Sequence, residues 1–383
     1  MQYAAYNKLM ERIQKTFIIN DLDKKMVFVA GPRQVGKTTL AQSFCSKWSR
    51  LQYLNFDAEK DRLMILRQEW DRKVDLVILD EIHKLKKWKT KLKGIYDTEG
   101  IKPRLLVTGS ARLDVLRKGG DSLAGRYFFH RLYPFSVREL RGHASPQELL
   151  DQLMKFGGFP EPFFSQSETS AARWRKQIFE RIIRADIMDL EPIRDIRSLI
   201  LLLDLLRERV GSPVSYNSLA RDLEVSPHTV KRWIEILENL YIVFRVTPYH
   251  RNLARTLLKE PKIYFYDTGS VHADPGKRLE NAVAVCLLKH LHFLEDTKGK
   301  NVALHYLRDK EKREVDFLTI IEGKSVNLIE VKLNEEKIHQ SLNYYVHQLK
   351  VEGIQLVHGI KQTRSVGNIS IVNAAQWLDE LEL

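Results

Sequence analysis

Cysteine is scarce in this sequence. Two of the 383 residues are cysteine, Cys45 and Cys286, and they stand far apart in the chain. So few thiols exclude a disulfide framework and a zinc cluster built from several cysteines. A low cysteine content is typical of proteins in the reducing cytosol, and we therefore expect a cytoplasmic location.

Long apolar runs are also missing. The most apolar stretch, at 199–206, is too short to span a bilayer and is interrupted by Asp204. The first residues, MQYAAYNKLMERIQKTF, contain no apolar segment of signal-peptide length and are typical of an amphipathic helix. We see no repeat of fixed period and no low-complexity tract. These absences predict no membrane partner.

Acidic residues are fewer than basic ones. The chain has 62 Lys and Arg against 49 Asp and Glu, which gives a formal net charge of +13. Its length is enough for two or three domains, and 44% hydrophobic content is ordinary for a folded protein. The positive excess favours a polyanionic partner, with DNA ahead of a membrane surface, although a solvated Lys-rich surface would carry the same charge.

The segment GPRQVGKT at 31–38 matches the pattern G-x-x-x-x-G-K-[ST]. The apolar MVFVA before it predicts a buried strand, and TTLAQSFCSKW after it predicts a helix. In that context, backbone N–H groups and a helix N-terminus can surround phosphate oxygens. We expect Lys37 to reach the β- and γ-phosphates of ATP and Thr38 to bind Mg²⁺.

A second strand ends in two acids. VDLVILDEIHKL gives an apolar run over 74–79, followed by Asp80 and Glu81. Asp80 is placed to hold Mg²⁺, directly or through water, and Glu81 to be the base that orients the attacking water. The alternative is a pair of solvated acids at a strand end.

A third apolar run, PRLLVTGSARL at 103–113, carries Thr108 and Ser110 where it ends. If this strand lies between the other two, either side chain could contact the γ-phosphate or the attacking water. RLQYLNFDAE at 50–59 predicts a further strand. Nearly continuous apolar runs indicate a parallel sheet, with the nucleotide at its carboxyl edge. The predicted nucleotide-binding residues are Gly31, Pro32, Arg33, Gln34, Val35, Gly36, Lys37, Thr38, Thr39, Thr108 and Ser110.

These three motifs together resemble the AAA+ ATPases. The resemblance implies a ring in which an arginine from a neighbouring subunit stabilises charge on the transferred phosphoryl group. Arg126 and Arg112 are the candidates for that catalytic role, with Arg131 behind them. The alternative for each is an ordinary surface arginine.

A lysine-rich run follows the acid pair. HKLKKWKTKLKGIYD carries six lysines around Trp88, so Lys87 and Lys89 are candidates for a DNA contact coupled to hydrolysis. Six lysines cannot share one helix face, so much of the run can equally be solvated.

The sequence from about 143 to 210 has few strand signals and is predicted to form helices. After them, GSPVSYNSLARDLEVSPHTVKRWIEILENLYIVFRVTPY has the spacing of a winged helix-turn-helix, in which Ser215 and Ser226 begin two helices. The exposed side of the second helix supplies the predicted DNA contacts His228, Thr229, Lys231 and Arg232. Winged helices also dock proteins, so a protein partner stays open.

The C-terminal region carries further carboxylates. Asp316 lies in REVDFLTII, and Glu330 and Lys332 alternate with apolar residues in NLIEVKL, so a hairpin would bring all three together. The pattern resembles PD-(D/E)XK nucleases, with Glu280 on a helix as another acid. That resemblance implies metal ligands Asp316 and Glu330 for Mg²⁺ or Mn²⁺, and a catalytic Lys332. The alternative is a cross-strand salt bridge.

The order of motifs is similar, over nearly the full length, to a family of prokaryotic AAA+ ATPases. Their C-terminal region of unknown function joins a winged helix to a restriction-endonuclease-like fold. GPRQVGKTTL, LDEIHK, TGSARL, SLAGRYFFHRLYPFS, PKIYFYDTG and REVDFL…LIEVK carry the resemblance. For PKIYFYDTG we expect only a buried strand that ends in a turn.

The sequence thus predicts an α/β protein of five segments. They are an N-terminal helix at 1–24, a P-loop AAA+ domain at 25–142, a helical linker at 143–210, a winged helix-turn-helix at 211–262 and a nuclease-like domain at 263–383.

We expect an oligomeric Mg²⁺-dependent ATPase, in a hexameric ring, that remodels branched or damaged DNA. One alternative is a nucleotide switch whose C-terminal domains bind a protein. Another is an ATP-gated nuclease in defence against foreign DNA.

Overall fold

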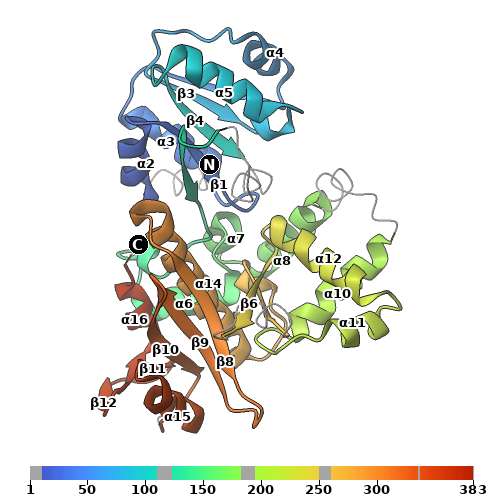
Figure 1. Cartoon of the computed structure of the whole chain (residues 1–383), viewed down its shortest axis with the longest axis vertical. Helices are drawn as coiled ribbons and strands as arrows, with labels where there is room; N and C mark the ends of the chain where they lie inside the picture. The colour runs from blue at the N-terminus through green and yellow to red at the C-terminus, as the bar shows by residue number, and fades with distance from the viewer. Residues whose placement is uncertain (1–10, 110–122, 183–194, 250–259, 335–336, 383) are drawn as a thin grey trace. The chain divides into compact units, whose positions relative to one another are not determined.

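The computed structural model of the chain describes residues 11–109, 123–182, 195–249, 260–334 and 337–382 (Figure 1). The chain divides into two compact units, Met1–Tyr133 and Pro134–Leu383, called here the N-terminal and the C-terminal unit. Both combine helices with a sheet, which confirms the predicted α/β class. The finer division into five segments remains a prediction.

The N-terminal unit is built on a parallel sheet. Its five strands lie in the order β2-β3-β4-β1-β5, and every neighbouring pair is parallel. Strand β4 lies between β1 and β3, which is the arrangement that a role for Thr108 at the phosphates requires. The strands are β1 (Met26–Ala30), β2 (Leu51–Asn55), β3 (Leu76–Asp80), β4 (Arg104–Gly109) and β5 (Tyr127–Arg131).

Helices cover both faces of this sheet, so β1 and β3 are buried along their whole length. Helix α5 (Trp88–Glu99) packs Trp88, Leu92 and Ile95 into the main core of the unit, and α4 (Glu59–Arg67) adds Ile65. Helix α2 (Gln14–Leu22) contacts β1, and α3 (Lys37–Ser43) contacts β4. The burial explains why these strands read as unbroken apolar runs.

The C-terminal unit begins with helices. They are α6 (Pro146–Phe156), α7 (Pro160–Ser165), α8 (Glu168–Arg181) and α10 (Ile196–Glu208). Ser145 caps α6 through a reciprocal bond with Glu148, and Asp195 caps α10. The predicted helical composition of this stretch is confirmed for the residues that the structure describes.

Two further helices, α11 (Tyr216–Asp222) and α12 (Pro227–Asn239), are joined by a short turn. The Ser226 side chain accepts a hydrogen bond from the Thr229 N–H, so it caps α12 as predicted. Strand β6 (Val243–Pro248) follows α12 and pairs with β7 (Lys262–Phe265) and with β8. The strands that follow α12 are therefore part of the large C-terminal sheet.

That sheet has eight strands in the order β12-β13-β11-β10-β9-β8-β6-β7. The remaining strands are β8 (Val302–Arg308), β9 (Glu314–Ile321), β10 (Lys324–Lys332), β11 (Glu352–Val357), β12 (Arg364–Val366) and β13 (Ile369–Asn373). β9 and β10 form the predicted antiparallel hairpin, in which Ile329 pairs with Phe317. The long helix α14 (Pro275–Lys298) packs across β7 to β10, α15 (Gln340–Leu349) packs on β9 to β11, and α16 (Ala374–Glu380) follows β13.

Candidate nucleotide site and carboxylate cluster

The loop between β1 and α3 has the backbone of a phosphate-binding loop. Gly36 adopts φ +101, and a Cβ on Gly31 would lie 2.1 Å from the Leu132 carbonyl oxygen. Both positions therefore require glycine. The Lys37 Nζ donates to the carbonyl oxygens of Gly31 and Pro32 at 2.9 and 2.6 Å. The ammonium thus lies within the loop, where phosphate oxygens would need it.

Asp80 is the centre of this site. Its Oδ1 accepts a hydrogen bond from Thr108 at 2.6 Å, and its Oδ2 accepts from Thr38 at 3.1 Å and from the Tyr53 hydroxyl at 2.5 Å. Three strand ends and the start of α3 therefore meet at one buried carboxylate. A carboxylate and a threonine hydroxyl side by side are suitable oxygen ligands for Mg²⁺, so these residues fit the implied ion.

Glu81 follows Asp80 in a left-handed backbone conformation, with φ +59. Its N–H donates to the Thr108 carbonyl at 2.9 Å, which ties the turn to β4. Burial raises the pKa of the Glu81 carboxyl above its usual range, although Lys84 opposes this shift. Within the described part of the chain, the Glu81 Oε2 is buried and has no hydrogen-bond partner. The His83 Nε2 and the Lys84 Nζ lie 3.5 and 3.6 Å from this oxygen. A buried carboxylate with a raised pKa is equipped to take a proton from water.

Two residues of this site were missed by the sequence analysis. Tyr53 stands near the end of β2, beside β3, so its position in the predicted strand was the available signal. Arg12 is buried and donates to the carbonyl oxygens of Val35 and Tyr133, thereby supporting the phosphate loop from outside. No motif in the sequence marks Arg12.

The structure describes Arg126 but not Arg112, the other candidate for the arginine supplied in trans. The predicted nucleotide-binding residue Ser110 also lies outside the described residues. Arg126 donates to both carboxylate oxygens of Asp97, at 2.6 and 3.2 Å. A role in a neighbouring subunit would therefore require Arg126 to leave this pair.

In the C-terminal unit, the structure brings the predicted carboxylates together. Glu330 of β10 lies opposite Asp316 of β9, and the Val331 N–H donates to the Asp316 Oδ2 at 3.0 Å. Glu280 of α14 faces the same cluster. Lys332 contacts the Glu330 Oε1 at 2.8 Å, and the His339 Nδ1 lies 3.2 Å from that oxygen.

The centre of this cluster is a residue that carried no predicted chemistry, Lys262 of β7. Its Nζ lies 3.2 Å from the Glu280 Oε1, 3.1 Å from the Asp316 Oδ1 and 2.8 Å from the Glu314 Oε1. The Lys262 side chain is fully buried. We call Lys262, Glu280, Glu314, Asp316 and Glu330 the carboxylate cluster.

Burial and proximity shift the titration of this cluster. Burial and the nearby Asp316 raise the pKa of Glu330 to about 8. Burial would raise the pKa of Asp316 too, but Lys262 and the Val331 N–H bring it below its usual range. Among the described residues, no group of three or more His, Cys, Asp or Glu is arranged to hold a metal ion.

Most of the residues predicted to contact DNA lie on the surface. His228, Lys231 and Arg232 are exposed on α12, whose other side is buried through Val230, Trp233, Ile234, Ile236 and Leu237. Thr229 is only half-buried, and its hydroxyl bonds to the Ser226 hydroxyl at 2.9 Å. In the N-terminal unit, Lys87 is exposed and the Lys89 ammonium lies 5.8 Å from the centre of the Trp88 ring.

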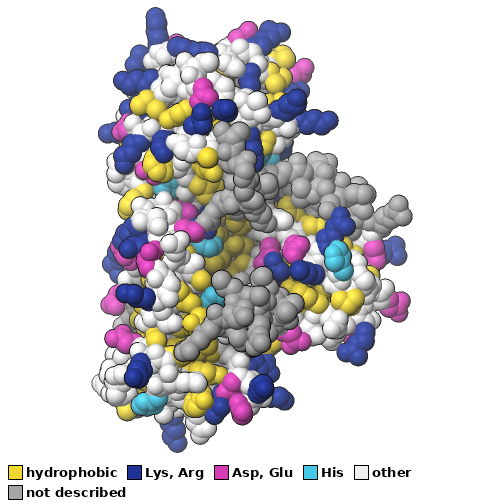
Figure 2. Space-filling view, viewed as in Figure 1, with side chains coloured by type: hydrophobic (Ala, Val, Ile, Leu, Met, Phe, Trp, Pro, Cys, Tyr) yellow, Lys and Arg dark blue, Asp and Glu magenta, His cyan; other side chains and the backbone are white. Residues whose placement is uncertain are grey.

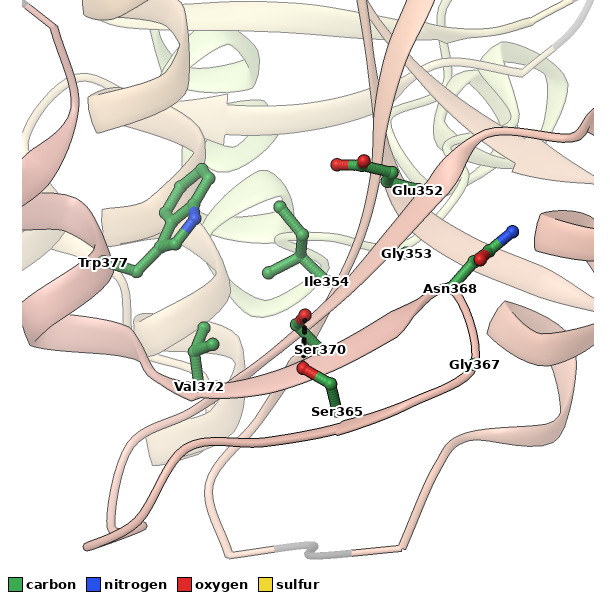
Figure 3. Close-up of a pocket in the computed structure, with 9 residues that line it drawn as sticks. All are labelled: Glu352, Gly353, Ile354, Ser365, Gly367, Asn368, Ser370, Val372 and Trp377. Atoms are coloured by element: carbon green, nitrogen blue, oxygen red, sulfur yellow. Dashed lines mark hydrogen bonds between the residues drawn. The ribbon is translucent and has the colours of Figure 1, made fainter.

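A pocket of about 350 Å³ lies at the β12 end of the C-terminal sheet (Figure 3). Trp377 and Val372 line it on one side, and the Ser365 and Ser370 hydroxyls bond to each other at 3.1 Å across its floor. Of the described residues that line it, Glu352 alone is charged. None of the residues predicted to carry chemistry contributes to this pocket.

The described residues contain no helix that is both long and apolar enough to cross a membrane. This finding agrees with the short apolar runs of the sequence.

Three family descriptions match the chain in succession. Residues 23–141 match an AAA domain, residues 147–277 match the domain of unknown function DUF8612, and residues 275–377 match the domain of unknown function DUF4143. The first match covers the phosphate loop, Asp80 and Glu81. The third match covers most of the carboxylate cluster.

Relatives of similar organisation occur in bacteria and archaea. An uncharacterized protein of Mycobacterium tuberculosis is 25% identical over 343 residues, which cover 87% of this chain and 76% of that protein. An uncharacterized protein of Methanocaldococcus jannaschii is 23% identical over 91% of this chain and 86% of its own length.

Solved structures give weaker likenesses. The Walker-type ATPase PABY2304 of Pyrococcus abyssi aligns with a TM-score of 0.42 and 14% identity, over 72% of this chain and 96% of that one. We therefore identify the chain from its family matches and from the phosphate-loop geometry. It contains an AAA-type ATPase domain at residues 23–141 and a C-terminal DUF4143 domain at residues 275–377.

Proposed function

We propose that this ATPase acts on DNA in the cytoplasm as a ring of identical subunits. The observation that carries the proposal is the surface of α12, where His228, Lys231 and Arg232 are exposed while the opposite side of the helix is buried. The net charge of +13 supports a polyanionic partner. On this view, ATP hydrolysis in the N-terminal unit remodels DNA held by the C-terminal unit.

The hydrolysis step follows from the side chains around Asp80. The loop amides and Lys37 would bind the phosphates, because Lys37 already points into the loop. Thr38 and Asp80 would hold Mg²⁺, which when bound neutralises charge on the β- and γ-phosphate oxygens. Thr108 and Tyr53 orient Asp80 through their hydroxyls.

Glu81 is the proposed general base. The Glu81 Oε2, which has no hydrogen-bond partner among the described residues, would accept a proton from the water that attacks the γ-phosphorus, and the raised pKa of Glu81 favours that transfer. Arg126 is the proposed residue in trans, after release from Asp97 by a neighbouring subunit. Arg112 stays the second candidate, from sequence alone.

The test is the steady-state ATPase rate with single-stranded, duplex and branched DNA at two salt concentrations. We expect one DNA form to stimulate turnover, and the stimulation to weaken at high salt because phosphate contacts release counterions. Lys231→Glu should weaken DNA binding and lower the salt slope by about one for the lost phosphate contact.

Lys361→Glu is the matched control. Lys361 is exposed, lies outside α12 and loses the same charge, so DNA affinity should hardly change. Equal effects of the two substitutions would show that α12 makes no specific contact. A normal basal rate without any DNA response would contradict the proposal.

A second function is favoured by the charge distribution. On the face drawn in Figure 2, Lys and Arg side chains are dispersed, with Asp and Glu between them, and do not form one continuous basic surface. This pattern supports a nucleotide switch in which α12 binds a protein. A switch would bind ATP tightly, hydrolyse it slowly and ignore DNA.

A further inference from the structure

The segment PKIYFYDTG contains a residue whose surroundings are unusual for lysine. Lys262 stands at the start of β7, fully buried, with three carboxylates within 3.2 Å of its ammonium. The centre of the Tyr306 ring lies 5.4 Å from the same ammonium. A buried lysine is stable only when its charge is compensated, and here the compensation comes from β9 and α14.

The electrostatics keep this lysine charged. Burial alone would lower the pKa of Lys262, but Tyr264 and the surrounding carboxylates hold it well above its usual value. The Tyr264 hydroxyl also donates to the Glu280 Oε1 at 2.6 Å. A full positive charge therefore sits between Glu280 and Asp316 at neutral pH.

The backbone of Gly211 and the side chain of Lys277 occupy the space beside the Glu280 carboxylate. Gly211, with φ +68, approaches so closely that a Cβ there would lie 2.6 Å from both Glu280 carboxylate oxygens. The Lys277 Nζ adds a second ammonium, 3.0 Å from the Glu280 Oε2 and 3.4 Å from the Gly211 carbonyl oxygen. Glu280 therefore already has two ammonium partners and a hydroxyl donor.

A nuclease-like fold implies a divalent ion at this place, and the residues present do not fit one. Mg²⁺ needs oxygen ligands at about 2.0–2.1 Å in octahedral geometry. Of the two implied ligands, Glu330 already contacts the Lys332 Nζ through its Oε1, at 2.8 Å. The Asp316 Oδ1 and the Glu280 Oε1 converge on the Lys262 Nζ. An ammonium and a divalent cation cannot share that position, because they would repel each other at contact distance.

We infer that the Lys262 ammonium takes the place of a divalent metal ion in the carboxylate cluster. The cluster then binds no metal and cleaves no phosphodiester bond. It serves instead to join β7, β9 and α14 through a buried ion network. This inference goes beyond the proposed function, since DNA binding by α12 does not depend on it.

The test measures Mn²⁺ binding to the full chain by electron paramagnetic resonance. Every variant carries Asp80→Asn, which removes the carboxylate of the phosphate-loop site. With Lys262 present, we expect no bound ion at the cluster up to about 1 mM free Mn²⁺. Lys262→Met should bind one ion per chain, and adding Asp316→Asn should abolish that binding.

Lys289→Met is the matched control. Lys289 is also buried and lies beside Glu139 and the Pro134 carbonyl oxygen, so its loss removes a second buried ammonium from the same unit. It should create no Mn²⁺ site. Two results would overturn the inference: binding to the Lys262 chain that Asp316→Asn abolishes, or a folded Lys262→Met chain that binds no Mn²⁺.

A second measurement decides the question if Lys262→Met does not fold. Supercoiled plasmid is incubated with the unmodified chain in Mg²⁺ and in Mn²⁺, beside the Asp316→Asn chain. We expect no nicking by either protein. Nicking that requires Asp316 would contradict the inference directly.

Discussion

Asp80 and Asp316 are both buried acids near strand ends, yet their surroundings differ in kind. Asp80 accepts hydrogen bonds from the hydroxyls of Thr38, Tyr53 and Thr108. Asp316 instead faces the ammonium of Lys262 at 3.1 Å. Hydroxyl donors orient a carboxylate but do not neutralise its negative charge, whereas an ammonium neutralises that charge.

The Asp80 carboxylate can therefore bind a cation such as Mg²⁺, whereas the Asp316 carboxylate is already paired with the cation of Lys262. Family resemblance would suggest an Mg²⁺ role for both acids. The partners of each acid, not its presence in a motif, decide which role is available. Four experiments test whether the two acids differ in this way.

The largest effect should come from Glu81→Gln. The amide keeps the shape of the side chain but cannot take a proton, so turnover should fall by about 10² to 10⁴ while ATP binding persists. A rapid filtration assay of bound ATP beside the hydrolysis rate would measure both. Glu69→Gln, an exposed change in the same unit, should have no effect. Normal hydrolysis by Glu81→Gln would remove this residue from the role of base.

Asp316→Asn should have the next largest effect, on stability. It leaves the buried Lys262 ammonium partly uncompensated, which should cost about 3–5 kcal/mol in free energy of unfolding. Urea unfolding followed by tryptophan fluorescence would measure this cost. Asp309→Asn breaks a surface pair with Arg313 and should cost about 1 kcal/mol or less. Equal costs would mean that the buried network contributes little.

Glu330 should make stability depend on pH. Its pKa rises from 4.5 to about 8 in the folded chain, so the folded state keeps a proton that the unfolded state has released. Stability should therefore fall as pH rises from about 5 to 7, by up to about 1.4 kcal/mol per pH unit. Glu330→Gln should flatten that slope in urea titrations at several pH values. An unchanged slope would place the titration on another group.

Tyr53→Phe should give the smallest effect. Loss of the hydroxyl that donates to Asp80 removes a hydrogen bond of about 0.5–1.5 kcal/mol, which predicts a turnover reduced about 2- to 13-fold. Because Tyr53 orients Asp80, the Mg²⁺ concentration needed for half-maximal rate should also rise. Tyr96→Phe, a half-buried change on α5, should alter neither quantity. A changed rate with an unchanged Mg²⁺ requirement would argue against a role through Asp80.

Sequence reasoning predicted the phosphate-loop region in detail because its determinants are local. Gly31, Gly36 and Lys37 lie within one short segment, and apolar runs reveal buried parallel strands directly. The β9–β10 hairpin and the capping of α12 by Ser226 were predictable for the same reason.

Long-range contacts were not predictable in this way. Tyr53 and Arg12 reach the nucleotide site from other elements, and neither belongs to a motif. The strands after α12 were expected to form a wing, but β6 also pairs with β8 of the large sheet. Strand pairing of this kind depends on which edges meet in three dimensions.

The phosphate loop with its acid pair, the α/β class and the basic charge of the chain can all be recognised without the structure. Those properties follow from composition and from residues close together in sequence. The position of Lys262 between Glu280 and Asp316 depends on the three-dimensional fold, because these residues lie 18 and 54 positions away in the sequence. A motif in the sequence does not distinguish a carboxylate that binds a metal ion from one that pairs with a lysine. The side chains around the carboxylate in the folded chain decide which cation compensates its charge.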